Sequence, residues 1–258
     1  MAEAALLSLG VAWAPLALSA EPPAAESESW KVKGSDPSEM ITRLEIREEY
    51  LSLPDNGYLN QVYLRGDYAP NENLAFRLQL PLAAGRQEDL GNHFGLGNMT
   101  LGSAGKLILN EKLSWIMGID FTLDTATQAA LGSGWNQIMP STALVFKPTP
   151  FWIFNATYQY IGSFGGDHNN TQPSIDESTI RLGALYNFPN GYWVYLDPRI
   201  YIDHTQKYAV SVFPEGEAGK VVAPDVEVWL RGGGRAAGNG RDERMGWVAE
   251  TGIRYFFH

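Results

Sequence analysis

The chain has 258 residues, no cysteine and a formal net charge of −10. The missing cysteine excludes disulfides, thiolate metal sites and cysteine nucleophiles, and the acidic balance disfavours nucleic acid as a partner. The length allows one large domain or two small ones.

The first 38 residues differ in composition from the rest of the chain. Leu6–Leu18 is an apolar run of secretory length, and Leu18-Ser19-Ala20 supplies small residues before a cut at Glu21. We therefore predict a signal peptide over residues 1–20 and a polar periplasmic segment over residues 21–38. No Lys or Arg lies in the first 30 residues, which is atypical of a signal, and the alternative is a short buried helix.

From residue 39 onward the hydrophobic period is two, which is typical of β-strands. In Leu74–Leu82, for example, every second residue is Leu or Phe and the others are Ala, Arg, Gln and Pro. No segment reaches 18 uninterrupted apolar residues, so a transmembrane helix is not expected. The pattern predicts an all-β domain over residues 39–258. The expected strands are twelve: 39–53, 58–69, 74–84, 98–109, 113–124, 138–147, 151–164, 178–188, 192–203, 208–214, 221–231 and 247–257. Pro214 and Pro224 weaken the tenth and eleventh, so ten strands is the fallback.

The predicted connections alternate in length along the chain. Those after the second, fourth, sixth and eighth strands are short, whereas those after the third, fifth, seventh and eleventh have about ten residues or more. Short turns at one end and long loops at the other are typical of an antiparallel up-and-down outer-membrane β-barrel.

The two faces of the predicted strands differ sharply in polarity. A soluble barrel or sandwich would turn the apolar face inward, and a transmembrane barrel would turn it to lipid. Strands of about 11 residues suit a tilted bilayer crossing, and Trp and Tyr lie mostly toward strand ends, where interfacial aromatic girdles lie. Both observations favour the transmembrane barrel, in the bacterial outer membrane, with charged side chains in its lumen.

The predicted lumen face carries basic and acidic residues in nearly equal number. The candidate pore-lining residues are Arg43, Glu45, Arg47, Glu49, Arg65, Asp67, Arg77, Lys106, Asp120, Lys147, Arg181, Asp197, Arg199, Glu227, Arg231, Glu250 and Arg254. Seven arginines among them are candidates for setting solute selectivity: Arg43, Arg47, Arg65, Arg77, Arg181, Arg199 and Arg231. The alternative is that internal salt bridges simply fill and stiffen the barrel.

The last strand ends on Glu250-Thr-Gly-Ile-Arg-Tyr-Phe-Phe257. This stretch resembles the C-terminal signature of bacterial outer-membrane barrels, in which a glycine precedes two alternating aromatic residues. The resemblance implies recognition by the barrel-assembly machinery through Gly252, Tyr255 and Phe257, with both aromatics facing lipid. His258 departs from the signature, because many such barrels end on Phe.

Phe94-Gly-Leu-Gly-Asn-Met-Thr-Leu-Gly102 resembles a second, narrower pattern. It is similar to a segment of the transporter-like outer-membrane proteins named for the MetA pathway of phenol degradation, with Asn98 where those proteins usually have Asp. The resemblance implies a channel-like protein for small compounds, aromatic ones among them.

The sequence thus predicts an outer-membrane barrel that binds or passes a small solute, with membrane lipid around it. It indicates no catalytic residues, no metal and no cofactor. Two alternatives stay open: a plugged structural or adhesive barrel, and a lipid hydrolase acting at the rim through a pair such as Ser163 and His168.

Overall fold

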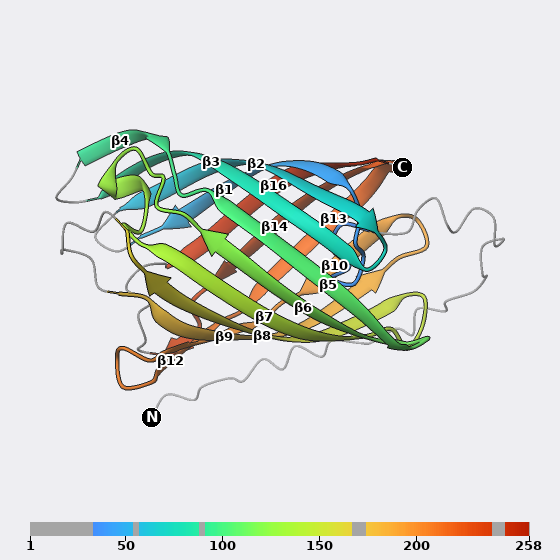
Figure 1. Ribbon diagram of the computed structural model, residues 1–258. Helices are drawn as coiled ribbons and strands as arrows, with labels where there is room; N and C mark the ends of the chain where they lie inside the picture. Colours follow the sequence, from blue (N-terminus) through green and yellow to red (C-terminus); the bar gives the residue numbers. More distant parts are fainter. Residues whose placement is uncertain (1–32, 54–56, 88–90, 167–173, 239–245, 258) are drawn as a thin grey trace, which may run out of the picture.

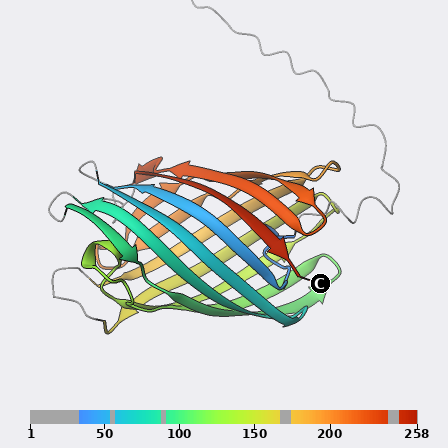
Figure 2. The same ribbon diagram turned by 90° about the horizontal axis from the view of Figure 1, so that it is seen from above.

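Antiparallel strands close into a ring of 12 in the computed structural model, which describes residues 33–53, 57–87, 91–166, 174–238 and 246–257 (Figures 1 and 2). The ring closes where β1 (Arg43–Ser52) pairs with β16 (Trp247–Phe256). Arg43 lies opposite Phe256, and Leu51 lies opposite Val248, so this pairing runs along almost the whole of both strands. The prediction of a closed antiparallel barrel of twelve strands is therefore confirmed.

Sixteen strand segments make up the twelve crossings, because four crossings are interrupted. The other continuous strands are β2 (Tyr58–Asn71), β3 (Leu74–Gln87), β6 (Leu113–Thr122), β7 (Asn136–Phe146), β8 (Trp152–Phe164) and β9 (Asp176–Asn187). The interrupted crossings are β4 (Gly91–Leu96) with β5 (Thr100–Asn110), β10 (Tyr192–Leu196) with β11 (Arg199–Asp203), β12 (Ala209–Phe213) with β13 (Glu215–Ala223), and β14 (Val226–Gly234) with β15 (Ala237–Gly238). A single 3₁₀ turn, Ala129–Leu131, lies between β6 and β7 among the described residues, where no helix is long and apolar enough to span a membrane.

The strand limits expected between residues 204 and 231 were wrong, although the strand count was right. Pro214 does not end a strand: β12 and β13 continue one crossing on either side of it. Its carbonyl still accepts a hydrogen bond from the Gly234 amide at 3.3 Å, so the proline costs the sheet only one donor. The hairpin turn instead falls at Pro224–Asp225, and β14 begins at Val226.

The glycine-rich stretch 85–97 was also expected to be a loop and is mostly strand. Leu82–Gln87 of β3 pairs with Gly91–Leu96 of β4, so the hairpin arms extend beyond the main sheet. Likewise Gly232–Gly234 belongs to β14 and pairs with Trp247–Ala249. Glycine lowers strand propensity, but cross-strand pairing outweighs that preference here.

The connections differ in length between the two ends of the barrel. Two-residue turns join β2 to β3 and β5 to β6, and short turns join β7 to β8 and β9 to β10, all at the end where β16 finishes (right in Figure 1). Long connections join β6 to β7 and β8 to β9 at the other end. In outer-membrane barrels the short turns are periplasmic, so we call the two ends the turn end and the loop end.

The barrel is inside-out relative to a soluble protein. Leu44, Ile46 and Leu64 face outward with 40%, 49% and 46% of their surface exposed, whereas Glu45 between the first two is 1% exposed. A soluble barrel would show the opposite arrangement, because exposed apolar surface costs free energy in water. The structure therefore excludes the soluble alternative and places lipid outside.

Gly252 provides a test of how closely the closing strands pack. A Cβ there would lie 2.9 Å from the Trp229 indole and 3.0 Å from Cβ of Arg47. We expect Gly252→Val to destabilise the barrel by about 1–3 kcal/mol through overpacking, measured by urea unfolding in detergent micelles followed by tryptophan fluorescence.

Gly66→Ala is the control, because a Cβ at Gly66 meets nothing within 4 Å. Equal stability of the Gly252→Val variant and the wild type would contradict this account of the closing strands.

Candidate functional site

Charged side chains gather on the inward positions of β14, β16, β1 and β2. Successive residues of a strand alternate between its two faces. Residues that lie opposite each other on neighbouring strands therefore share a face, and this brings the inward charges side by side. Glu45 lies opposite Arg254 on one side of β1 and opposite Arg65 on the other, and Arg254 in turn lies opposite Glu227. The spacing of charges in the sequence therefore becomes a lateral ladder around the lumen.

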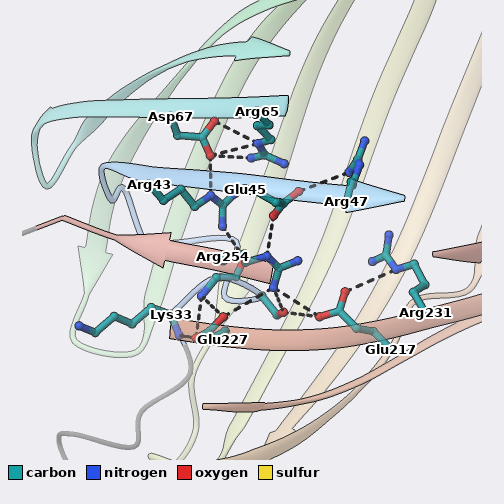
Figure 3. A network of polar contacts seen from close by, with 12 residues as sticks. Lys33, Arg43, Glu45, Arg47, Arg65, Asp67, Glu217, Glu227, Arg231 and Arg254 are labelled. Carbon is teal, nitrogen blue, oxygen red and sulfur yellow. Dashed lines mark hydrogen bonds and ion pairs between the residues drawn. The ribbon is translucent and has the colours of Figure 1, made fainter. Parts of the chain in front are cut away.

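Arg254 is the centre of the first cluster of this ladder (Figure 3). Its Nε lies 2.6 Å from Glu45, and its Nη1 lies 3.6 Å from Glu227 and 3.7 Å from Glu217. Its guanidinium also stacks over Trp229, with 4.6 Å to the ring centroid. Three carboxylates share one cation here, and Glu45 and Glu217 have a second, more distant cation partner in Arg47 at 3.8 Å and Arg231 at 3.5 Å.

Asp67 is the centre of a second cluster with the opposite stoichiometry. It lies 2.6 Å from Arg43, 2.7 Å from Arg65 and 3.2 Å from Arg77. Arg77 also reaches Asp120, at 3.4 Å. One carboxylate thus holds three arginines, and the outermost of them, Arg77, has 35% of its side chain exposed.

A third cluster surrounds Asp197, which sits between β10 and β11. Arg181 binds it with a charge-assisted pair, and Arg199 and Arg231 each lie 3.5 Å away. Glu215 lies 2.9 Å from Arg199 and 3.7 Å from Arg231. The break in the strand before Pro198 therefore coincides with the place where three arginines converge.

The wall formed by β5 to β8 carries fewer charges, and several small neutral side chains face the lumen there beside Asp120. Ala104, Gly118, Ser141 and Thr157 border the same cavity as the arginines opposite. This cavity has a volume of about 430 Å³. The free space therefore lies off-centre, between a small neutral wall and a charged wall.

Residues 33–42, which we call the N-terminal strap, lie in the mouth at the turn end. The Lys33 amide donates to Glu227 at 2.8 Å, Ser35 Oγ donates to Glu217, and Arg254 donates to Ser35 Oγ at 2.8 Å. Residues 33–38 thus contact lumen side chains, and the rest of the expected periplasmic segment 21–38 lies outside the described residues.

The strap reaches the far side of the ring at Lys147, which directly follows β7. Asp36 lies 2.6 Å from Lys147 Nζ and Glu39 lies 3.2 Å from it. Burial alone would lower the pKa of Lys147, but these two carboxylates raise it above its ordinary value, so the cation persists at neutral pH. Met40 packs against the buried apolar cluster that contains Ile116 and Ala143. The strap is held by ion pairs with Lys147 at one wall, by hydrogen bonds to Glu227, Glu217 and Arg254 at the other, and by an apolar anchor between them.

The candidate pore-lining residues divide into three groups. Twelve of them border the cavity: Arg43, Arg47, Glu49, Arg65, Asp67, Arg77, Asp120, Arg181, Arg199, Arg231, Glu250 and Arg254. Glu45, Asp197 and Glu227 are almost fully buried behind these. Lys147 binds the strap, and Lys106 of β5 lies opposite the cavity-lining Ile116 of β6 but is not itself among the residues that border the cavity.

Sequence reasoning missed two lumen carboxylates, Glu215 and Glu217. The stretch 215–220 was expected to connect two strands, and it is part of β13. The spacing of the two glutamates by two residues was the available signal, because it places both on one face of a strand.

The C-terminal residues of the predicted assembly signal lie at the end of the closing strand β16. Tyr255 and Phe257 are 46% and 50% exposed on the lipid side, with ring centroids 4.9 Å apart, and Gly252 faces the lumen side against Trp229.

The rim dyad considered for a hydrolase is only partly described. His168 lies outside the described residues, and Ser163 Oγ accepts a hydrogen bond from the Ile175 amide at 2.8 Å. A different pair, Ser178 and His204, is in contact at 2.8 Å near the loop end. Ser178 also shares a 2.9 Å hydrogen bond with Tyr158 and is only 3% exposed, so a substrate cannot reach its hydroxyl in this arrangement.

Comparison with known proteins supports the fold. No family model and no curated protein sequence matches the chain. Among solved structures, the COG4313 outer membrane channel from Pseudomonas putida F1 superposes with a TM-score of 0.69 at 15% identity, covering 86% of this chain and 98% of that one. The NanC porin (TM-score 0.61, 11% identity, 83% and 100% coverage) and the KdgM porin (0.58, 10%, 84% and 99%) are also similar.

These matches show that the chain has the fold of outer-membrane channels. The fold agrees with the resemblance of Phe94–Gly102 to the MetA-pathway family.

The cluster around Arg254 predicts a strong effect on stability. Arg254→Met would leave Glu45, Glu217 and Glu227 without their shared cation, and breaking a buried ion pair from one side costs about 3–5 kcal/mol. We expect a loss of that size in urea unfolding of the detergent-refolded protein.

Arg254→Met combined with Glu45→Gln should recover part of the loss, since one orphaned charge is removed with the cation. An additive or larger loss in the double variant would show that the two residues are not coupled.

Proposed function

We propose that the chain is a narrow outer-membrane channel whose lumen favours small organic anions. The observation that carries this proposal is the unequal exposure of the charges that border the cavity. The side chains of Arg77, Arg181 and Arg199 are 35%, 29% and 22% exposed. The carboxylates that hold them are less exposed: Asp67, Asp120, Asp197 and Glu215 are 8%, 18%, 1% and 1% exposed.

A solute in the cavity therefore meets guanidinium groups in front of carboxylates. Arginine presents several donors in a planar fork that matches a carboxylate. The buried carboxylates occupy one side of each guanidinium group and leave its lumen-facing side accessible to a solute. Local potential thus differs from the net charge of −10, because the acids that balance the arginines are deeper in the wall.

The lumen is also selective by size. The cavity of about 430 Å³ lies between the charged wall and the small side chains of β5 to β8, and the strap borders it at the turn end. This space suits a single small solute, in keeping with a twelve-stranded ring that is narrower than the large porins. The KdgM porin has been seen in complex with oligogalacturonate, a polymer of sugar acids, and has the same fold. That case supports an anionic solute class for this chain.

The plugged barrel is the second candidate, and the strap is the specific observation in its favour. Hydrogen bonds on one wall and ion pairs on the other hold the strap across the mouth. A channel requires that solutes pass beside the strap or that it moves aside.

Three further features of the proposal rest on sequence patterns. We propose that residues 1–20 form a signal peptide, which lies outside the described residues, and that the chain resides in a bacterial outer membrane. We also propose that the barrel-assembly machinery recognises the closing strand. The exposed, alternating aromatics Tyr255 and Phe257 support this last point.

Planar-bilayer recordings of refolded protein test the channel and its selectivity together. We expect single-channel conductance and a reversal potential in a salt gradient that shows anion preference. Arg77→Gln should lower the anion-to-cation permeability ratio by about fivefold at most, because one accessible charge near a solvated solute contributes about 1 kcal/mol. Asp67 keeps Arg43 and Arg65 in this variant, so folding should be preserved.

Folded protein without any conductance would favour the plugged barrel. Cation preference in the wild type would contradict the proposed solute class while leaving the channel intact.

The strap should limit the current. Lys147→Gln removes the cation that binds Asp36 and Glu39, and we expect a larger or more fluctuating single-channel conductance as the strap detaches from that wall. Lys112→Gln, in the neighbouring turn at the same end, is the matched control. Identical recordings for both variants would show that the strap does not restrict ion flow.

A further inference from the structure

The outer wall carries a groove near the turn end, on the lipid side of β10, β13 and β14. Its volume is about 660 Å³, and Tyr192, Val194, Ala218, Val228 and Leu230 are among its lining residues. The register explains the concavity, because Ala218 lies between Val194 and Leu230 on the neighbouring strands. Two residues before Ala218, and so nearer the loop end, Gly216 lies opposite Leu196. A Cβ added at Gly216 would have no neighbouring atom closer than 3.8 Å. Ala218 thus forms the floor of the groove, larger apolar residues form its sides, and Gly216 adds no side chain to the outer wall beyond it.

The end of the groove nearest the turns carries a positive charge. Lys220 follows Ala218 by two residues on the same face of β13, and its Nζ lies 4.6 Å from the centroid of the Tyr192 ring. Among the described residues no carboxylate forms an ion pair with Lys220. The ammonium is therefore positioned by an aromatic face and remains available to an anion.

Nearby aromatic residues show the depth at which this ammonium lies. Three aromatic residues lie on the adjoining outer wall at the turn end: Trp152, Tyr186 and Phe188. The ring centroid of Tyr186 lies 4.8 Å from that of Trp152 and 4.7 Å from that of Phe188. Such girdles mark the boundary between hydrocarbon and headgroups. Lys220 can extend its amine to that boundary while its methylenes stay in the apolar layer.

From this geometry we propose that the groove binds a glycerophospholipid of the periplasmic leaflet. One acyl chain lies along β13 over Ala218 and Gly216, and the headgroup phosphate pairs with Lys220. The apolar sides and floor exclude a hydrophilic ligand, and the single cation at the headgroup level complements a phosphate. The site lies outside the barrel, so it is independent of the solute that the lumen carries.

Native mass spectrometry of the full refolded protein in neutral detergent, titrated with dioleoyl-phosphatidylglycerol, tests the proposal. We expect the wild type to retain one molecule of this lipid more strongly than dioleoyl-phosphatidylcholine, whose choline group offsets the phosphate charge. Lys220→Gln should weaken retention by about fivefold, the contribution of one lysine near a lipid surface. Ala218→Phe should abolish it by filling the floor.

Two matched controls place the same substitutions elsewhere: Lys112→Gln in a turn at the same end, and Ala156→Phe on the outward face of β8. Both should retain the lipid as the wild type does, and the shift in electrophoretic mobility on heating verifies that every variant is folded. Equal retention by Lys220→Gln, Ala218→Phe and the wild type would overturn the proposal. So would a dimer that disappears in Ala218→Phe, since the groove would then hold a second copy of the chain.

Discussion

The structure depends on one constraint, which is that every backbone amide and carbonyl facing hydrocarbon must be paired within the protein. An open sheet would leave two unpaired edges, and each unpaired group would cost several kcal/mol in lipid. The β1–β16 pairing removes those edges by joining the two ends of the chain. It also brings both chain ends of the barrel to the turn end, which is why the strap that precedes β1 lies at that mouth rather than the other (Figure 1). At Pro214 the sheet lacks one backbone N–H donor, but the proline carbonyl still accepts a hydrogen bond from the Gly234 amide.

Closure sends half of all strand side chains into a confined lumen, and there the cost of burying charge decides their arrangement. Burying a charge without a partner would cost too much desolvation free energy. The charged lumen residues therefore form shared clusters around Arg254, Asp67 and Asp197. Internal salt bridges therefore do fill and stiffen one side of the barrel, as the simpler interpretation held. They also leave the outer edges of several guanidinium groups accessible, because each central carboxylate holds more arginines than it can cover. The proposed selection of solutes would follow from the same arrangement, and small residues on β5 to β8 border the free space beside the charged wall.

The outer surface obeys a different rule, because lipid contributes no hydrogen bonds and little preference among apolar side chains. The features that vary on this outer surface are its shape and the depth in the membrane at which polar atoms lie. The aromatic residues Trp152, Tyr186 and Phe188 mark one interface, and the small residues of β13 hollow the wall beside them. The outer groove is thus separate from the cavity inside the barrel.

The amino-acid sequence by itself determined the all-β class, the twelve crossings, the end with short turns and the two faces of each strand. These properties are local, because they follow from the period of two and from turn residues. It also pointed to the inward charges and to the alternating aromatics of the closing strand. Only the tertiary structure decided which charges meet: Arg254 reaches Glu45 and Glu217 across 209 and about 40 residues of chain, and nothing local encodes that pairing. The same holds for the contacts of the strap with the lumen walls and for β13, whose glutamates were expected in a connection between two strands. In each case long-range pairing across the closed ring outweighed the local signal.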